Sequence, residues 1–401
     1  MKISKSTYLL IACTLAMSFW EFSPITSILN RDIILGMSLI WSIIGFYIKG
    51  PFIRSCLMIK YKWMWITILG GVFISMFNAF LFWEQDIKIT FIAQRFVYTF
   101  LLLPALFYIQ PSFSDIIRVL KYMSYITLIC WILCIISPTL FNISEANIEY
   151  IQNSKTDIGY YVAGIHFVLL YVYFLIQEYT KDFTYKKFLI ALFWIIFIML
   201  YQNRSTMIGV IIMLIYSFFI IKSNIKPLII SSIAILLFIT INHTWDIWYA
   251  LVEETESQIN NDDYNRWKAL SYYFNDYSPN IWCYIFGNGM PSGGNSAFGN
   301  LLWANMAKGI FASDLGLIGM WTIYGILPLI CIYFIIYKFI IHQNKFPLML
   351  KFIGIHILII PTIFTFSNGA GALFFTLLFY LYAYFNELPM LKKRHNIRYK
   401  I

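Results

Sequence analysis

Hydrophobic residues occur along this chain in long runs that are not interrupted by regular polar alternation. The runs are about 16–22 residues long, the length that a helix needs to cross the hydrocarbon core of a bilayer. Backbone polar groups in lipid must be hydrogen-bonded within the chain, and without alternation these runs favour helices over a closed barrel. The pattern predicts twelve transmembrane helices, at 7–23, 33–48, 63–83, 89–109, 123–140, 159–177, 188–201, 206–221, 227–242, 315–337, 352–366 and 371–386.

Composition agrees with this pattern. Of the 401 residues, 60% are hydrophobic and only 12% are charged, and the mean hydropathy is +0.71. A soluble protein of this length carries about twice that share of charge. We therefore expect an all-α polytopic integral membrane protein, in which residues 1–401 form a single membrane domain.

The distribution of charge predicts an orientation. If both termini are cytoplasmic, most of the 29 Lys and Arg residues fall on the cytoplasmic side, as the positive-inside rule requires. The exceptions are Arg31, Lys88, Arg95, Lys155, Arg204, Arg266, Lys268 and Lys308. Acidic residues show the opposite bias, and those on the cytoplasmic side are Asp115, Glu178, Asp182 and Glu387. The net charge of +10 reflects this asymmetry, so no nucleic-acid partner is indicated.

One connection is much longer than the others. The segment 243–309 lies between the ninth and tenth predicted spans, on the external (periplasmic) side. Its many Trp and Tyr residues argue against disorder. "HTWDIWYALVEETESQI" predicts an amphipathic surface helix. "DDYNRWKALSYYFND" predicts a second helix, with Asp262 or Asp263 as its N-cap. "GNGMPSGGNSAFGN" predicts a backbone that turns tightly over a site or forms a nest for an anion.

Two arginines stand out among the apolar spans. Arg95 lies inside the fourth predicted span, where an arginine is costly by about 2.5–3.5 kcal/mol on insertion scales. It either snorkels to the outer interface or faces an anion inside the bundle. Arg204, in "YQNRSTMIGV", precedes the eighth span, whose start at Ser205-Thr206 offers an N-cap and unsatisfied N–H groups. This is either a tight interfacial turn or a phosphate site.

The long loop and its return supply further candidates. Arg266 either pairs with a neighbouring aspartate or binds an anion, and the aromatic residues near it either stack on sugars or form the core of the loop. These aromatic residues are Tyr264, Trp267, Tyr272 and Tyr273. Asp314 is either a helix cap or a carboxylate that faces the same cavity as the arginines. His243, at the start of the loop, is a further candidate base.

These residues suggest a binding site for a doubly charged anion at the outer leaflet. No cytoplasmic domain and no nucleotide-binding motif is predicted, so the energy for any chemistry must come from an activated substrate in the membrane. A lipid pyrophosphate meets both conditions. It binds arginines and is also an activated leaving group.

Three motifs together resemble the O-antigen ligase and polymerase superfamily. They are "YQNRSTMIGV" at the start of a span, "YNRWKAL…IWCYIFGNGM" in the loop, and "SDLGLIGMWTIYGILPLI" where the chain re-enters the membrane. The resemblance covers the topology and about residues 200–330. The ligase branch has a histidine late in its loop, whereas residues 257–314 of this chain contain none. That difference favours the Wzy-type O-antigen polymerase branch and leaves the general base unassigned.

The resemblance implies inverting glycosyl transfer at the periplasmic face of the bacterial inner membrane, with the loop 243–309 capping the active-site cavity. A chain on undecaprenyl pyrophosphate donates its reducing-end sugar to a hydroxyl of the incoming lipid-linked repeat unit. On this interpretation the pyrophosphate is bound by Arg95, Arg204 and Arg266. Asp314 or His243 orients or deprotonates the acceptor, and the loop aromatics hold sugars. No metal or other cofactor is expected, and a polysaccharide chain-length regulator is a candidate partner.

Two alternatives stay open. One is an O-antigen ligase that transfers the finished polysaccharide to lipid A core. The other is a flippase or other transporter of lipid-linked oligosaccharide, for which twelve spans are equally suitable. A transporter should carry polar residues along a path through the bundle to the cytoplasmic side, whereas the unusual charges of this sequence lie towards the outside.

Overall fold

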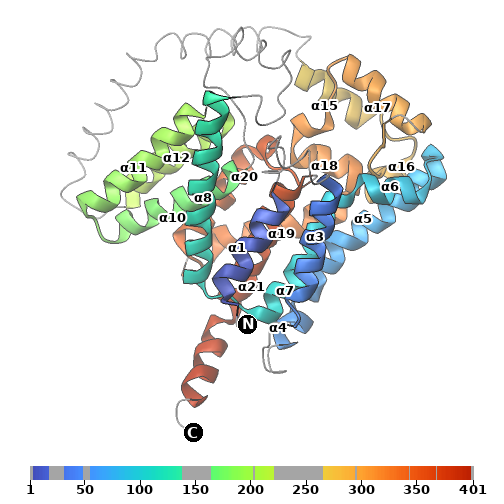
Figure 1. Ribbon diagram of the computed structural model, residues 1–401. Coiled ribbons are helices and arrows are strands. Elements are labelled where there is room, and N and C mark those ends of the chain that lie inside the picture. Colours follow the sequence, from blue (N-terminus) through green and yellow to red (C-terminus); the bar gives the residue numbers. More distant parts are fainter. Residues whose placement is uncertain are drawn as a thin grey trace, which may run out of the picture.

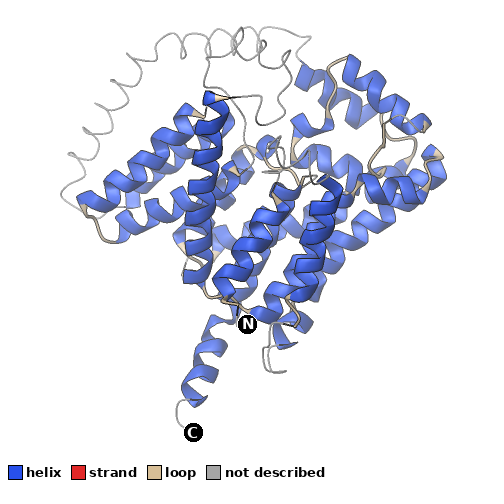
Figure 2. Ribbon diagram, in the orientation of Figure 1, coloured by secondary structure: helices blue, strands red, loops and turns tan. Residues whose placement is uncertain are grey.

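The computed structural model describes residues 3–17, 31–47, 55–137, 164–201, 204–220, 265–293, 296–342, 344–366 and 368–398. Every regular element in these ranges is a helix, and they contain no strand (Figure 2). The predicted all-α class is confirmed. Both termini lie at one end of the molecule, at the bottom of the view in Figure 1, whereas α15 and α17 lie near its top.

The first half of the described chain contains α1 (Lys5–Ala16), α3 (Arg31–Ile44), α4 (Ser55–Lys60), α5 (Lys62–Trp83), α6 (Ile87–Ala93), the 3₁₀-helix η3 (Arg95–Leu101), α7 (Leu102–Ile109) and α8 (Phe113–Ile136). The centre contains α10 (Ile165–Lys181), α11 (Tyr185–Leu200), α12 (Arg204–Ile220), α15 (Asn265–Asn275), α16 (Ile281–Phe286) and α17 (Ala297–Ala307). The last part contains η5 (Ala312–Leu315), α18 (Leu317–Tyr324), α19 (Ile326–Ile341), α20 (Leu348–Ile359), η6 (Pro361–Ile363) and α21 (Gly369–Arg398).

Helices occur at eleven of the twelve segments predicted as spans, and the ninth, 227–242, lies outside the described residues. By length and composition, three described helices can cross a membrane: Lys62–Trp83, Phe113–Ile136 and Gly369–Glu387. A fourth is possible if the bent pair Ile87–Ala93 and Arg95–Ile109 forms one span. The helix expected in "DDYNRWKALSYYFND" is α15, but Asp262 and Asp263 lie outside the described residues, as does the predicted surface helix before them.

The fourth predicted span is not continuous. It bends by 69° between α6 and the segment that follows, and the chain continues as 3₁₀-helix through η3 before α7 begins. Gln94 lies at the bend, where its buried side chain donates from Nε2 to Ser75 Oγ of α5 at 3.1 Å. Apolar periodicity records the run of hydrophobic residues but cannot reveal a bend held by a side-chain hydrogen bond to another helix.

The tenth predicted span is also divided, into α18 and α19 at Gly325. This glycine has φ +81°, and a Cβ there would lie 2.5 Å from the carbonyl carbon of Phe286. The backbones of two segments therefore touch at a point where only glycine fits. The break follows from the docking of α16 against the bundle, which the sequence of the span does not reveal.

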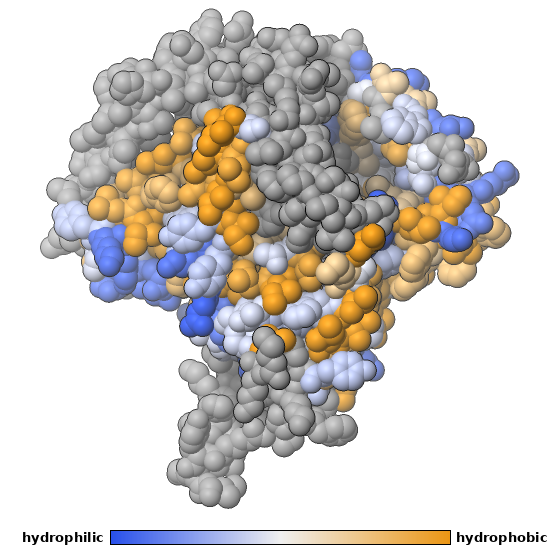
Figure 3. All heavy atoms as spheres, viewed as in Figure 1, coloured by the Kyte–Doolittle hydropathy of each residue, from blue (hydrophilic) through white to orange (hydrophobic). Residues whose placement is uncertain are grey.

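Among the three membrane-length helices the most buried is α21, which packs against η3, α7 and α1; 83% of the residues in its membrane-length window are buried. By contrast, α3 and α8 present large exposed hydrophobic side chains. Figure 3 shows these as hydrophobic surface between more hydrophilic regions on either side. The side chains are Ile33, Met37, Ile40 and Ile43 of α3, and Ile129, Ile132 and Ile136 of α8.

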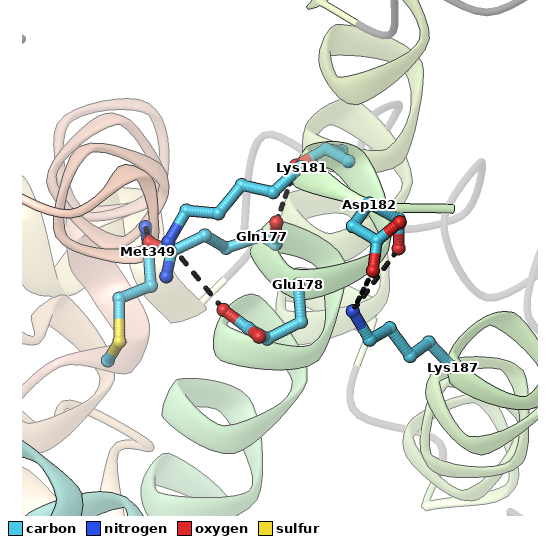
Figure 4. Close-up of polar contacts among 7 residues, drawn as sticks. Gln177, Glu178, Lys181, Asp182, Lys187 and Met349 are labelled. Carbon is cyan, nitrogen blue, oxygen red and sulfur yellow. Dashed lines mark hydrogen bonds and ion pairs between the residues drawn. The ribbon is translucent and has the colours of Figure 1, made fainter. Parts of the chain in front are cut away.

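Polar contacts join the C-terminal end of α10 to α11 and α20 (Figure 4). Gln177 Oε1 accepts a hydrogen bond from the backbone N–H of Met349 at the start of α20, at 3.0 Å. Lys187 of α11 pairs with Asp182 at 3.0 Å. This ion pair is solvent-exposed and contributes little stability, whereas the buried Gln177 contact sets the register of α10 against α20.

Candidate functional site

The return of the long loop to the bundle brings Arg266 and Asp314 into electrostatic contact. Arg266 lies in the first turn of α15, which packs against η5, the element that carries Asp314. Burial raises the pKa of the half-buried Asp314 carboxyl above its usual value, and the charge of Arg266 opposes that rise. Within the described ranges no direct ion pair joins the two groups. A carboxyl with a raised pKa beside a cation is suited to proton transfer.

A small hydrophobic core holds these two elements in place. Tyr273 and Tyr277 are buried at the end of α15, against Phe298 of α17 and Leu315 of η5. Trp83, the last residue of α5, stacks on Phe298 with ring centroids 4.5 Å apart. The described part of the loop therefore packs on the end of α5, and this core holds α15 against η5.

The four aromatic residues predicted to hold sugars lie in different environments. Tyr273 is 2% exposed and belongs to the loop core. Tyr272 is partly buried, and its hydroxyl oxygen accepts a hydrogen bond from Asn305 Nδ2 at 3.1 Å. Trp267 is 62% exposed and free to stack on a ligand. Tyr264 lies outside the described residues. The core interpretation thus fits Tyr273, and Trp267 has the geometry for stacking.

The short helix η6 packs between η5, which carries Asp314, and α12. It packs against η5 on one side and against α12 and α20 on the other. Gly316, directly after η5, has φ +56°, and a Cβ there would lie 2.3 Å from the carbonyl oxygen of Pro361. This close approach requires glycine. The contact fixes the chain after η5 against η6, which in turn packs on α12.

Arg204 is the first residue of α12, so Ser205 lies within the first turn and not at an N-cap position. The side chain of Arg204 lies outside the described part of the chain. One and a half turns further along, Gly209 faces His356 of α20; a Cβ at this position would lie 2.1 Å from His356 Nε2. His356 is fully buried, and its Nδ1 lies 2.6 Å from the Tyr173 hydroxyl. His243, the candidate base, lies outside the described residues.

Arg95 lies at the bend that follows α6. Its Nη1 donates to the backbone carbonyl of Ile92 at 3.1 Å, and its guanidinium lies 4.9 Å from the centroid of the Phe96 ring. These contacts involve neither α15 nor η5. For Arg266 and Asp314, by contrast, the packing of α15 on η5 brings the charge of the guanidinium within reach of the carboxyl.

The glycine-rich stretch of the loop does not form an anion nest at residues 287–289. Their three backbone N–H groups donate to the carbonyls of Cys283, Thr322 and Ile323, at 2.9, 2.9 and 2.8 Å. None of the three is left to bind an anion. The positive φ values of Gly287 and Gly289 (+83° and +78°) allow the chain to lie against α18 instead, and this part of the prediction was wrong.

Sequence reasoning missed the side chains that hold this stretch. Gln85 is fully buried and makes four hydrogen bonds, to Thr90, Met290, Ser292 and Ser296. Asn78 of α5 and Asn288 make similar bridges to Gly287 and Thr322. The available signal was an amide side chain within or beside an apolar span, where it must find partners. The loop partners of Gln85 and Asn78 lie about two hundred residues away in sequence.

No family model matches the chain, and no curated protein or solved structure matches it either. Among the described residues, no group of three or more His, Cys, Asp or Glu side chains is placed to hold a metal ion. The candidate site is therefore defined by its own geometry. It consists of a half-buried carboxyl, a guanidinium that influences it, an exposed tryptophan, and a helix start on the far side of η6.

Proposed function

We propose that this protein is a membrane glycosyltransferase that joins lipid-linked oligosaccharide repeat units into a surface polysaccharide. The substrates are undecaprenyl-pyrophosphate-linked oligosaccharides, and the reaction is inverting glycosyl transfer at the outer face of the bacterial inner membrane. The proposal includes twelve spans, cytoplasmic termini, and a loop over 243–309 that covers the site.

The observation that carries the proposal is the packing of α15 on η5, which places the half-buried Asp314 within the electrostatic influence of Arg266. Half-burial and the nearby guanidinium give the Asp314 carboxyl the properties of a group that exchanges protons. The exposed Trp267 on the same helix as Arg266 offers a stacking surface for a sugar. Apolar helices long enough to cross a membrane support a lipid-borne substrate.

In the proposed reaction, Asp314 accepts the proton of the acceptor hydroxyl as its oxygen attacks the anomeric carbon of the donor sugar. The bond from that carbon to the pyrophosphate oxygen breaks, and undecaprenyl pyrophosphate leaves with the bonding electrons. Arg266, Arg204 and Arg95 are assigned to the anionic pyrophosphate groups. The bond to the leaving group supplies the free energy, so the reaction needs no nucleotide.

The test is genetic and uses the surface polysaccharide as readout. A polymerase-null strain carrying Arg204→Ala, with membrane insertion confirmed, should lack the long-chain ladder. Lys at this position should restore it only in part, because an ammonium lacks the bidentate fork of guanidinium. Normal ladders from Arg204→Ala would remove this residue from the site. The same strain also tests the ligase alternative. Loss of a ligase leaves finished polymer on the lipid carrier, whereas loss of the polymerase removes the long polymer.

A transporter of the same lipid is the second candidate, and one observation favours it. Buried polar side chains follow the interface of α10, α12 and α20. Lys351, 9% exposed, donates to the hydroxyl of Tyr216, and the Tyr173–His356 pair lies about 7.5 Å further along α20. Ionisable residues within a bundle are costly and commonly functional.

Purified protein distinguishes the two candidates. Polymer formation from lipid-linked repeat units in detergent, where there is no sealed bilayer, supports the enzyme. Lipid scrambling in vesicles without polymer supports the transporter. The variant Lys351→Met should leave polymer formation intact if the enzyme proposal is correct, because Lys351 lies far along α20 from η6 and the loop return.

A further inference from the structure

The second half of the long loop has the composition of a membrane segment. Residues 277–307 contain no charged side chain, although Asp276 and Lys308 border them directly. This stretch lies in a connection that the hydropathy pattern assigns to the aqueous side. A surface segment of this length in water normally carries charge. The composition therefore needs an explanation from the position of the segment.

Asn78 fixes the first part of this stretch, α16, beside α5. Its Nδ2 donates to the carbonyl of Trp282 at 3.3 Å and to the carbonyl of Gly287 at 2.8 Å. Asn78 lies five residues before Trp83 at the end of α5, or about 7.5 Å along the helix axis. α16 thus lies alongside the last turns of a membrane-length helix, and not beyond its end.

The outer face of α16 is apolar and exposed. Ile281 is 64% exposed and Trp282 is 55% exposed. On the neighbouring turns of α5, Phe77 and Leu81 are also exposed, at 56% and 64%. Both α16 and the neighbouring turns of α5 therefore present exposed apolar side chains. The Trp282 ring is stacked parallel to Phe286, with an interplanar angle of 8°.

The non-helical chain after α16 is hydrogen-bonded to protein and needs few bonds to water. The N–H groups of residues 287–289 all donate to backbone carbonyls. Gln85 donates from Nε2 to the Met290 carbonyl at 2.9 Å and accepts at Oε1 from the Ser292 N–H at 3.0 Å. Irregular backbone occurs at membrane depth only when its polar groups are satisfied in this way.

We infer that residues 281–292 form a re-entrant segment that enters the outer leaflet of the bilayer, and that lipid chains contact Ile281 and Trp282. The uncharged sequence, the position beside Asn78, the exposed apolar side chains and the backbone hydrogen bonds to protein together support this environment. Tryptophan is enriched at such depths because its ring is amphipathic. The inference does not rest on the glycosyltransferase proposal, since a transporter would hold the segment in the same place.

The unmodified protein offers a matched pair of tryptophans for the test. Trp267 and Trp282 are exposed to nearly the same extent, 62% and 55%. In proteoliposomes, hydroxyl-radical footprinting read by mass spectrometry should oxidise Trp282 severalfold more slowly than Trp267, because lipid covers only Trp282. Equal oxidation rates would place α16 in water and overturn the inference.

A spin label identifies what covers the segment. The label is placed at Ile281 by Ile281→Cys, with Phe77→Cys and Trp267→Cys as lipid-side and water-side references, in a background without the native cysteines. Collisions with dissolved oxygen should dominate at 281, as at 77, and collisions with a water-soluble nickel chelate should dominate at 267. Chelate access at 281 contradicts the inference. Protection from both reagents also contradicts it, because a protein surface and not lipid would then cover α16.

Discussion

Replacing Gln85 by Leu tests how the loop is attached to the bundle. The substitution keeps the volume of a fully buried side chain but removes its four hydrogen bonds. The Met290 carbonyl and the Ser292 N–H then lose their partner. Because both groups are only partly buried, each is expected to cost about 1 kcal/mol, the low end of the usual range. The sum, about 2 kcal/mol, corresponds to a roughly 30-fold increase in the equilibrium constant for local opening.

Cys283 reports this opening directly. Its thiol is fully buried in α16, so it reacts with a thiol reagent only when the segment opens. The labelling rate of Cys283, measured by mass spectrometry of its peptide, should rise roughly 30-fold in Gln85→Leu if opening is in rapid equilibrium. Gln177→Leu is the matched control, because it removes a buried amide contact at the other end of the bundle.

Two results would refute this reasoning. An unchanged Cys283 rate in Gln85→Leu would mean that the four bonds do not hold the loop. An equal increase in Gln177→Leu would mean that Cys283 reports global unfolding and not detachment of α16. The expected pattern is an increase in the first variant and the wild-type rate in the second.

Three further predictions follow from single residues. Gly325→Ala should abolish folded, monodisperse protein in detergent, because φ is +81° and the new Cβ would overlap the Phe286 backbone. Gly70→Ala is the control: a Cβ there has nothing within 4 Å, so this variant should elute like the wild type on size exclusion. If Asp314 is the base, Arg266→Gln should raise the pKa of Asp314 further. Because only the carboxylate accepts a proton, the acidic limb of the pH–activity profile should move to higher pH. An unmoved limb would exclude this coupling between Arg266 and Asp314. Trp267→Ala should raise KM for the lipid-linked substrate with little change in the yield of folded protein, and an unchanged KM would exclude sugar stacking at this residue.

Helix positions could be predicted from the sequence, because each depends on a local run of apolar residues. The segment predicted at 63–83 corresponds to α5, observed at Lys62–Trp83. Breaks within runs could not be predicted. The bend at Gln94 depends on its bond to Ser75, and the break at Gly325 depends on the backbone of Phe286. Periodicity carries no information about such distant partners.

The candidate site could be predicted only in part, because residue types can be read from the sequence whereas contacts between distant residues cannot. Arg266 could be selected as a basic residue among the aromatic residues of the loop, and Asp314 as a carboxylate where the chain re-enters the membrane. Their proximity depends on how the loop core packs α15 on η5. The glycines of residues 287–289 suggested an anion nest because their flexibility is visible in the sequence. The carbonyls of α16 and α18 that accept hydrogen bonds from the N–H groups of residues 287–289 are not visible there.

We propose above that Asp314, under the influence of Arg266, takes part in transferring a sugar from a lipid pyrophosphate. The most direct measurement uses purified protein in detergent with undecaprenyl-pyrophosphate-linked repeat units, and compares the wild type with Asp314→Asn for both substrate binding and polymer length. The account predicts polymer from the wild type, and unchanged binding without polymer from Asp314→Asn. Wild-type rates of polymer formation by Asp314→Asn, or no polymer from the wild-type protein, would contradict it.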